Sequence, residues 1–461
     1  MSKHEYTGGH VPFWQKVAFG ISGMCNDFMG NVIMVLAMPI FNIGLGLDAR
    51  LVGIALAIPK LWDAITDPIM GNISDNTRMK FGRRKPYMLA GSFIGGLLFA
   101  LMWRVSPEWS QTQLFLWLTG MSVLFYTAYT VFGVPANGLA SELTMDVKER
   151  TRVMAYRSFF AYSAGLITAW AYRLCFVKQF GATEVEAVKW VGVIFGLLII
   201  ITGAIPAIFC KENPAGEHQE KIKIVPAIKE TLKNRAFLLL VGMVFFILMG
   251  IFLVHPMALY LGIYYLFDGD KAAAAQLGAF AATMFSVGGM AATPLVAWLG
   301  TRFGKRHTLL GSLVVLVIAS LLSWVFYTPE NPYLSFICML LMSPGMCCVW
   351  ILLGSMLADV CDLDELNTGL RREGMYGAMY SWFLKAAVAG VIALSGFLVT
   401  WSGVDPELVV QSPQAVINMR LLFALTPPVF YLIAFGCIWF YPLSEQRMYE
   451  VREELNARKA N

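Results

Sequence analysis

The stretch TRMKFGRRK at residues 77–85 recurs in shortened form as TRFGKR at residues 301–306. Each copy has Thr-Arg, then Phe-Gly, then two basic residues, and each follows the second apolar run in a series of six. The same motif at corresponding places in two series indicates an internal repeat. The spacing therefore predicts two like halves, in which a basic Gly turn anchors the second and third spans at a membrane surface.

The composition indicates that most of the chain lies inside a membrane. Of its 461 residues, 57% are hydrophobic and 14% are charged. An apolar run of about 20 residues is long enough to cross a bilayer as a helix. We predict an all-α integral membrane protein with twelve transmembrane helices, at residues 14–40, 48–74, 86–106, 112–140, 153–177, 186–209, 236–265, 273–300, 308–327, 332–359, 374–402 and 416–441.

The longest polar stretch falls between the sixth and seventh runs and divides the chain in two. It is rich in Lys, Glu and Pro, which is typical of a linker with room for one surface helix at most. The predicted organisation is an N-terminal six-helix bundle at 1–209, a cytoplasmic linker at 210–235, a C-terminal bundle at 236–441 and a cytoplasmic tail at 442–461.

Lys and Arg concentrate in the loops on the same side as the N-terminus. The positive-inside rule therefore places both termini in the cytoplasm, as in a multi-pass protein of a bacterial inner membrane. The first apolar run is long enough to be a span and lacks a small-residue cleavage site, so it does not resemble a signal peptide. The net charge of +5 reflects this topology and gives no sign of nucleic-acid binding.

Two carboxylates stand inside the second predicted span, within LWDAITDPIMG at residues 61–71. Asp63 and Asp67 share one helix face, roughly 5–6 Å apart at Cβ. Each costs at least about 2.5 kcal/mol at bilayer depth, and two like charges so close do not both ionise cheaply. A bound cation or a proton resolves the repulsion, and Pro68 frees a carbonyl beside the pair. The pattern predicts a coupling-ion site; the alternative is a salt bridge, for example with Lys60.

The sequence shows no nucleophile–base set, metal-ligand cluster or nucleotide-binding loop. Its eight cysteines lie mostly inside predicted spans, without histidines at metal-ligand spacing, so we interpret them as free and buried. We therefore expect no enzymatic activity and no cofactor. Transport work would be driven by an ion gradient and not by ATP.

Five motifs resemble those of the glycoside–pentoside–hexuronide:cation symporter family of the major facilitator superfamily. The resemblance runs from the first span to the eleventh. It implies two pseudo-symmetric six-helix bundles that carry a sugar together with Na⁺, Li⁺ or H⁺ by alternating access. The motifs are residues 62–71, the turn at 76–86, residues 146–150, residues 359–362, and residues 371–374 leading to Lys385.

The resemblance also implies roles for individual residues. The cation site comprises Asp63, Asp67, Thr66 and Thr130. Asp27 binds sugar hydroxyls and Lys385 links the cation and sugar sites. An aromatic face and polar side chains complete a sugar site, although any single aromatic residue can instead pack against lipid or another helix. The predicted substrate residues are Asp27, Asn26, Arg157, Trp350, Asn137, Tyr380 and Lys385.

Three positions depart from the melibiose carriers of this family. Gly133 replaces a second sugar-binding aspartate, Asn137 replaces a nearby aromatic residue, and Thr66 replaces an asparagine beside the cation site. With one carboxylate fewer, Arg157 and Lys385 are able to receive an acidic sugar such as a uronide. Alternatively, Gly133 makes room for a larger neutral sugar. The change at Thr66 leaves Na⁺ and H⁺ both open as the coupling ion.

Charged residues near the cytoplasmic helix ends have a different predicted role. We interpret them as ion pairs of a cytoplasmic gate, and not as ligands; they are Glu142, Arg150, Asp359, Asp362, Arg371 and Arg372. His255 and Pro256, in the seventh span, either line the cavity or kink the helix.

The leading functional prediction is cation-coupled symport of a sugar, glycoside or uronide, by a protein that works as a monomer in the lipid bilayer. One alternative is a lipid or lysolipid carrier on the same fold. The other is a non-transporting membrane sensor, which would need an added signalling domain or the loss of the carboxylate pair; the sequence shows neither.

Overall fold

The computed structural model describes residues 11–77, 79, 81–144, 147–211, 233–369, 372–406, 408 and 410–460. Within these ranges the regular elements are helices, with no strand. The chain forms two compact units, Met1–Gln219 and Glu220–Asn461. We refer to them as the N-terminal unit and the C-terminal unit.

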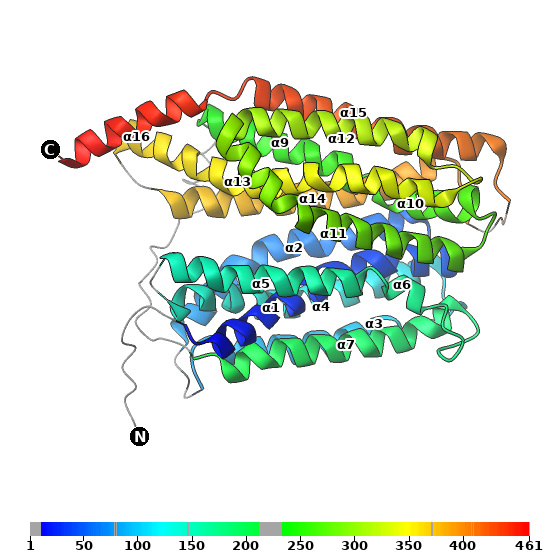
Figure 1. The fold of residues 1–461 in the computed structure, drawn as a ribbon. Coiled ribbons are helices and arrows are strands. Elements are labelled where there is room, and N and C mark those ends of the chain that lie inside the picture. Colours follow the sequence, from blue (N-terminus) through cyan, green and yellow to red (C-terminus); the bar gives the residue numbers. More distant parts are fainter. Residues whose placement is uncertain are drawn as a thin grey trace. The chain divides into compact units, whose positions relative to one another are not determined.

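Six long helices build the N-terminal unit, and they run side by side in Figure 1. The first ends in a π-helix, η1, and a short helix, α6, follows the fifth. The elements are α1 (Phe13–Ala37), η1 (Met38–Gly44), α2 (Ala49–Asn76), α3 (Lys85–Met102), α4 (Gln111–Leu143), α5 (Val147–Thr168), α6 (Ala171–Leu174) and α7 (Glu184–Phe209).

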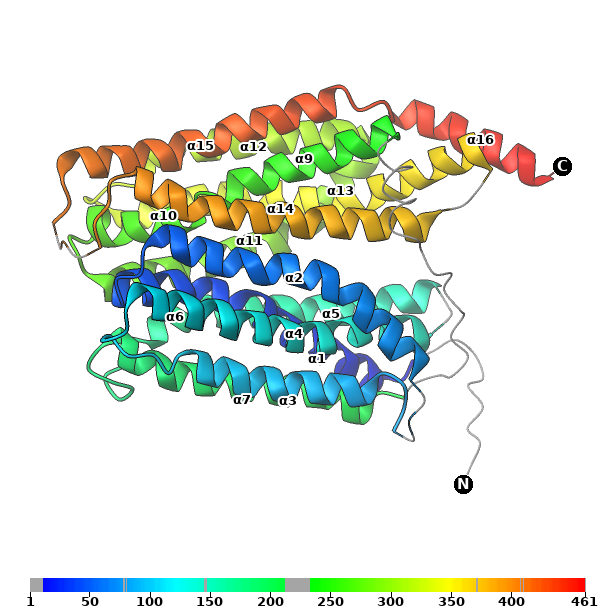
Figure 2. The same ribbon diagram turned by 180° about the vertical axis from the view of Figure 1, so that it is seen from behind.

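The C-terminal unit repeats this plan, and Figure 2 shows it from behind. Its first span also ends in a π-helix, η2, and an additional helix follows its sixth span. The elements are α9 (Arg235–Phe252), α10 (His255–Leu261), η2 (Gly262–Leu266), α11 (Lys271–Phe303), α12 (Lys305–Phe326), η3 (Pro332–Leu334), α13 (Ser335–Thr368), α14 (Glu373–Trp401), α15 (Pro413–Trp439) and α16 (Glu445–Ala460).

The same pairs of helices pack together in the two units. In the N-terminal unit the main pairs are α1 with α5, α3 with α7, α2 with α4, α3 with α4, and α1 with α7. In the C-terminal unit they are α9 with α14, α12 with α15, α11 with α13, α12 with α13, and α15 with α9. Numbered by order of span, these are one set of five pairs, so the repeat in sequence corresponds to a repeat in packing.

Local chemistry explains the positions of several helix starts and turns. Ser110 and Gln113 form a capping box at the start of α4, in which side chain and backbone exchange hydrogen bonds. Gly82 and Gly304 have φ values of +110° and +80° and belong to the two copies of the repeated turn. Glycine is required there because other residues rarely adopt positive φ.

Small residues let helices approach closely inside the N-terminal unit. A Cβ atom added to Gly96 of α3 would lie 2.4 Å from the carbonyl oxygen of Gly196 on α7. Apolar burial between helices gains little in lipid, so close van der Waals packing of this kind holds spans together.

Ten of the long helices meet a criterion of length and mean hydropathy for crossing a membrane. The other two, α2 and α5, have 28 and 22 residues, which is long enough to span a hydrocarbon core of about 30 Å. Their polar residues, including Asp63, Asp67 and Arg157, lower their hydropathy. The fold is therefore the expected one, twelve transmembrane helices in two pseudo-symmetric six-helix bundles.

Three local features differ from the sequence prediction or add to it. The seventh span breaks after Phe252, and α10 starts at His255, so the His-Pro pair does interrupt the helix. The tenth span continues nine residues past its predicted end, to Thr368, because its polar end remains helical. The tail forms α16, whose Met448, Val451 and Leu455 are buried against the C-terminal unit. The linker at 212–232 lies outside the described residues.

Candidate functional site

The centre of the candidate site is a hydroxyl between two carboxylates. Thr130 Oγ1 on α4 lies 2.5 Å from Asp63 Oδ1 and 3.2 Å from Asp67 Oδ1, both on α2. Asp63 is 2% exposed and Thr130 is 3% exposed. Three of the four residues predicted for the cation site thus share one cluster, which joins two helices; Asp67 is its half-buried member.

Thr66 brings a further oxygen to the cluster. Its Oγ1 lies 3.3 Å from Thr130 Oγ1, and within hydrogen-bonding distance of the carbonyl oxygens of Trp62 (3.2 Å) and Asp63 (3.4 Å). One turn away, Trp62 Nε1 donates to Thr127 Oγ1 at 2.9 Å, which fixes α2 against α4. Hard oxygen donors such as these are the ligands that non-transition cations prefer.

One hydroxyl serves both carboxylates of the pair. Thr130 has one hydroxyl proton, so it donates to Asp63 or to Asp67 but not to both at once. Two ionised carboxylates this close together repel each other, and a cation or an added proton between them lowers that repulsion. Lys60, the alternative partner considered from the sequence, has its Nζ 4.2 Å from the centre of the Tyr126 ring, and its salt bridge with the pair stays an alternative prediction.

A second polar group lies around Asp27 on α1. Asn31 Nδ2 donates to Asp27 Oδ1 at 2.7 Å, and Thr168 Oγ1 donates to Asp27 Oδ2 at 3.2 Å. Thr168 is the last residue of α5, so this bond ties α1 to α5. Neither Asn31 nor Thr168 was predicted as part of the site. The signal for Asn31 is its place four residues after Asp27, on the same helix face.

Two further pairs connect the predicted substrate residues of the N-terminal unit. Arg157 Nη2 on α5 donates to Asn137 Oδ1 on α4 at 2.6 Å. Tyr129 OH on α4 donates to Asn26 Oδ1 on α1 at 3.1 Å. A Cβ atom at Gly133 would lie 3.6 Å from the Tyr129 ring and 3.7 Å from Asn26 Oδ1, so this position borders the Tyr129–Asn26 pair and has room for a side chain.

Helix α4 connects the two groups through consecutive residues. Tyr129 contacts Asn26 beside Asp27, and Thr130 contacts the carboxylate pair. A shift of α4 therefore changes both groups together.

The remaining predicted substrate residues belong to the C-terminal unit. Trp350 lies on α13 and is 49% exposed, whereas Tyr380 and Lys385 lie half-buried on α14. Sequence resemblance alone assigns Trp350 and Lys385 to the substrate, and Tyr380 was predicted only as a candidate aromatic platform.

Two of the predicted gate residues, Asp359 and Arg372, form ion pairs with described residues. Asp359, which is buried, accepts a hydrogen bond of 2.6 Å from Lys305 of the repeated turn. Arg372 forms a two-point contact with Asp364, at 2.6 and 2.8 Å, and Asp364 was not predicted. Asp362 lies half-buried on α13. Arg371 and the side chains of Glu142 and Arg150 lie outside the described residues.

The sequence analysis also missed Glu149, a buried carboxylate at the start of α5. It accepts from Lys16 Nζ (2.6 Å), from the backbone N–H of Val11 (3.0 Å) and from Arg152 (3.2 Å). The one feature of the sequence that could have indicated Glu149 is that it is an acidic residue among the basic residues of its turn. It ties the start of α1 to α5.

Comparison with known proteins agrees with this architecture. Residues 18–445 match the family described as MFS/sugar transport protein. An uncharacterized symporter of Synechocystis is 25% identical over 97% of each chain, and a glucuronide carrier protein homolog of Escherichia coli is 24% identical over 96% of this chain and 95% of that protein. A solved bacterial homologue of the human lysosomal transporter Spinster, in an inward-facing conformation, has a TM-score of 0.65 at 16% identity, covering 94% of this chain and 98% of that chain.

The fold and the comparisons define a major facilitator transporter. The chain belongs to the MFS/sugar transport protein family, which confirms the resemblance found in its motifs.

Proposed function

We propose that this protein is a secondary active transporter that carries a sugar together with Na⁺ or H⁺. The observation that carries the proposal is the carboxylate pair of Asp63, which is buried, and Asp67, which is half-buried, on either side of Thr130. The cation is cargo at this site. It neutralises the carboxylates when it enters, and its return to water releases them.

The oxygen set supports a small hard cation. Thr66 and Thr130 add two neutral hydroxyl oxygens to the two carboxylates. A proton needs one carboxylate and a hydrogen-bond partner, whereas Na⁺ needs several oxygens around it. Both therefore remain candidates, and a direct measurement separates them.

An acidic sugar is the substrate class that we favour. Arg157 is held by a neutral amide, Asn137, and forms no ion pair with a carboxylate in the described part of the chain. Its remaining N–H groups are suited to a carboxylate in a fork geometry. The absence of a side chain at Gly133 leaves space beside Asn26 and Tyr129. The glucuronide carrier homolog among its relatives points the same way.

The proposal includes a location and an orientation. The protein lies in the cytoplasmic membrane as a monomer. Both of its termini are inside, because Lys and Arg concentrate in the loops on that side. Lys385 and Trp350 contribute to the substrate site and the gate residues close its cytoplasmic side, as the family resemblance implies.

The experiment is uptake by purified protein in liposomes. Neutral glycosides and uronides are offered at fixed pH, with an inward Na⁺ gradient, with an inward proton gradient, or with neither. Wild-type protein is compared with Asp67→Asn, which keeps the shape of the side chain and removes its charge.

We expect gradient-driven accumulation of a uronide by the wild type and none by Asp67→Asn. Accumulation under only one gradient identifies the coupling ion. Accumulation of neutral glycosides at full rate, with uronides neither carried nor competing, would refute the acidic-sugar assignment. Failure of every sugar under both gradients would refute the symporter and favour a lipid carrier.

A further inference from the structure

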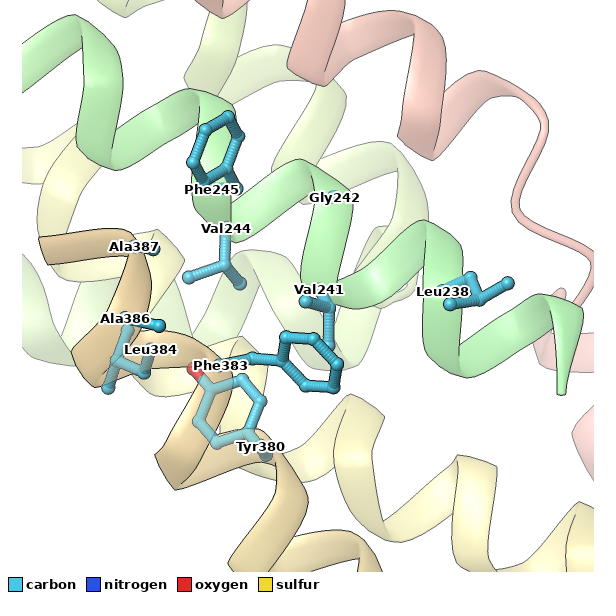
Figure 3. A pocket seen from close by; sticks show the side chains of 10 residues that line it. All are labelled: Leu238, Val241, Gly242, Val244, Phe245, Tyr380, Phe383, Leu384, Ala386 and Ala387. Atoms are coloured by element: carbon cyan, nitrogen blue, oxygen red, sulfur yellow. The ribbon is translucent and has the colours of Figure 1, made fainter. Parts of the chain in front are cut away.

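A cavity of about 400 Å³ lies between α9 and α14 in the C-terminal unit. Figure 3 shows side chains from both helices around it. Its volume is within the range of small-molecule sites, about 300–1,000 Å³. Nine of its ten lining residues are apolar, and the tenth supplies one hydroxyl; they are Leu238, Val241, Gly242, Val244, Phe245, Tyr380, Phe383, Leu384, Ala386 and Ala387.

The cavity opens on the outside of its unit. Leu238 and Phe245, on its α9 side, are 40% and 37% exposed. Tyr380 is half-buried and its hydroxyl forms no hydrogen bond with the described residues. A wall of this composition admits hydrocarbon from the bilayer and gives a polar substrate little to bind.

Its depth places it in one leaflet. Asn234 Nδ2 donates to Tyr376 OH at 3.0 Å, so α9 and α14 start at the same end of the unit. Leu238 and Phe245 follow Arg235 by three and ten residues, roughly 5 and 15 Å along the helix at 1.5 Å per residue. A hydrocarbon core is about 30 Å thick, so the cavity occupies the half nearer Arg235.

Arg235 supplies a positive charge at the mouth of this groove. It is the first residue of α9, is exposed, and precedes Leu238 by three positions, so the two side chains share a helix face. No carboxylate in the described part of the chain pairs with it. The N-terminal end of a helix adds a partial positive charge at the same point.

We propose that this groove binds a phospholipid with an anionic headgroup. The phosphate contacts Arg235 at the membrane surface, and an acyl chain lies between α9 and α14 against Val241, Gly242 and Phe383. The positive charge of Arg235 matches the phosphate of such a lipid, and the apolar wall within one leaflet matches its acyl chain. The groove shares Tyr380 with the predicted substrate residues, and its lining contains none of the four predicted cation-site residues.

The test is native mass spectrometry of the full-length protein in detergent, titrated with dioleoylphosphatidylglycerol or dioleoylphosphatidylcholine. Arg235→Gln removes the charge. Gly242→Leu adds a side chain to the wall of the groove, and an added Cβ there meets only Cys437 Sγ of α15 at 3.7 Å, an ordinary contact. The matched controls are Arg302→Gln, another exposed arginine at a helix end, and Gly311→Leu, where an added Cβ meets nothing within 4 Å.

We expect a saturable phosphatidylglycerol adduct that both groove variants weaken about tenfold, equal to about 1.4 kcal/mol, while both controls bind like the wild type. Gel filtration confirms that each variant is folded. Equal phosphatidylglycerol binding by Arg235→Gln, by Gly242→Leu and by wild type would overturn the proposal. Equal affinity for phosphatidylcholine would also overturn it, as would a protein dimer in place of the lipid adduct.

Discussion

The second and fourth spans pack against each other in both units, but they carry different side chains where they meet. In the N-terminal unit Asp67 precedes Pro68 on α2, and Asp67 meets Thr130 of α4. In the C-terminal unit Thr293 precedes Pro294 on α11, and Thr293 Oγ1 lies 3.5 Å from Cys347 Sγ of α13. Four residues earlier, Asp63 in one helix corresponds to Gly289 in the other.

The difference separates what the fold needs from what the function needs. Both pairs of helices pack closely, so carboxylates are not required to hold α2-type and α4-type spans together. Each buried carboxylate costs at least about 2.5 kcal/mol at bilayer depth, and only the N-terminal unit carries that cost at this place. The C-terminal unit packs in the same way without carboxylates at this place. We therefore attribute the carboxylates of the N-terminal unit to its function and not to its folding.

Removal of one charge from the carboxylate pair should reduce transport strongly. Asp63→Asn keeps the side-chain shape and removes the charge of the carboxylate whose Oδ1 lies 2.5 Å from Thr130 Oγ1. We expect cation-driven uptake to fall by about 100-fold or more, because a lost buried charge interaction of about 3 kcal/mol corresponds to that factor. Uptake into liposomes under a cation gradient measures it.

The control is the corresponding position, Gly289→Ala, where an added Cβ lies 4.0 Å from its nearest neighbour, the Ser343 carbonyl oxygen. It should retain uptake within about twofold. Gradient-driven accumulation by Asp63→Asn at the wild-type level would show that the carboxylate pair is a structural feature in this unit.

The starts of the first spans offer a second contrast. Glu149 holds α1 to α5 through an ion pair with Lys16, whereas the corresponding helices α9 and α14 are joined by the neutral bond from Asn234 to Tyr376. Glu149→Gln leaves Lys16 buried without its charge partner, which we expect to cost about 3 kcal/mol of stability. The measured quantity is the midpoint of thermal unfolding in detergent.

Asn234→Ala is the comparison variant. It loses two neutral hydrogen bonds, one to Tyr376 OH and one from the Phe237 backbone N–H at the start of α9, together about 2 kcal/mol. We expect its midpoint to fall less than that of Glu149→Gln. Equal midpoints for the two variants would mean that the ion pair adds nothing over the two neutral hydrogen bonds.

A thiol at position 130 makes the N-terminal site resemble its counterpart. Thr130→Cys replaces a hard oxygen ligand with a soft sulfur, which suits alkali cations poorly. We expect the cation concentration for half-maximal uptake to rise about tenfold, a loss of about 1.4 kcal/mol, with Thr130→Ser close to the wild type. Initial uptake rates over a series of cation concentrations give this value. An unchanged value in the Cys variant would remove Thr130 from the cation site.

The sequence predicts the spans well because hydropathy and the repeated turn report directly on the membrane and on the two halves. Asp63 and Asp67 were recognisable because a carboxylate pair is costly in an apolar run, whereas Thr66 was noticed only through the family resemblance. Thr168 and Glu149 were not, since each acts on a residue more than a hundred positions away, and only packing of α1 against α5 brings them together. The π-helices at the ends of the first spans of the two units were not predicted, because the apolar periodicity does not distinguish them from α-helix.

The smallest expected effect concerns the uncharged counterpart itself. Thr293 Oγ1 already bonds to the Gly289 carbonyl oxygen at 3.1 Å within its own helix, so Thr293→Val removes a contact that a membrane helix readily does without. We expect uptake, cation dependence and thermal stability to stay within about twofold or 0.5 kcal/mol of the wild type. The same assays applied to Thr130→Val should show a clear loss of cation affinity, because that hydroxyl lies between two carboxylates. If Thr293→Val were as damaging as Thr130→Val, the C-terminal pair would have a ligand role of its own, and the two units would share the work of cation binding.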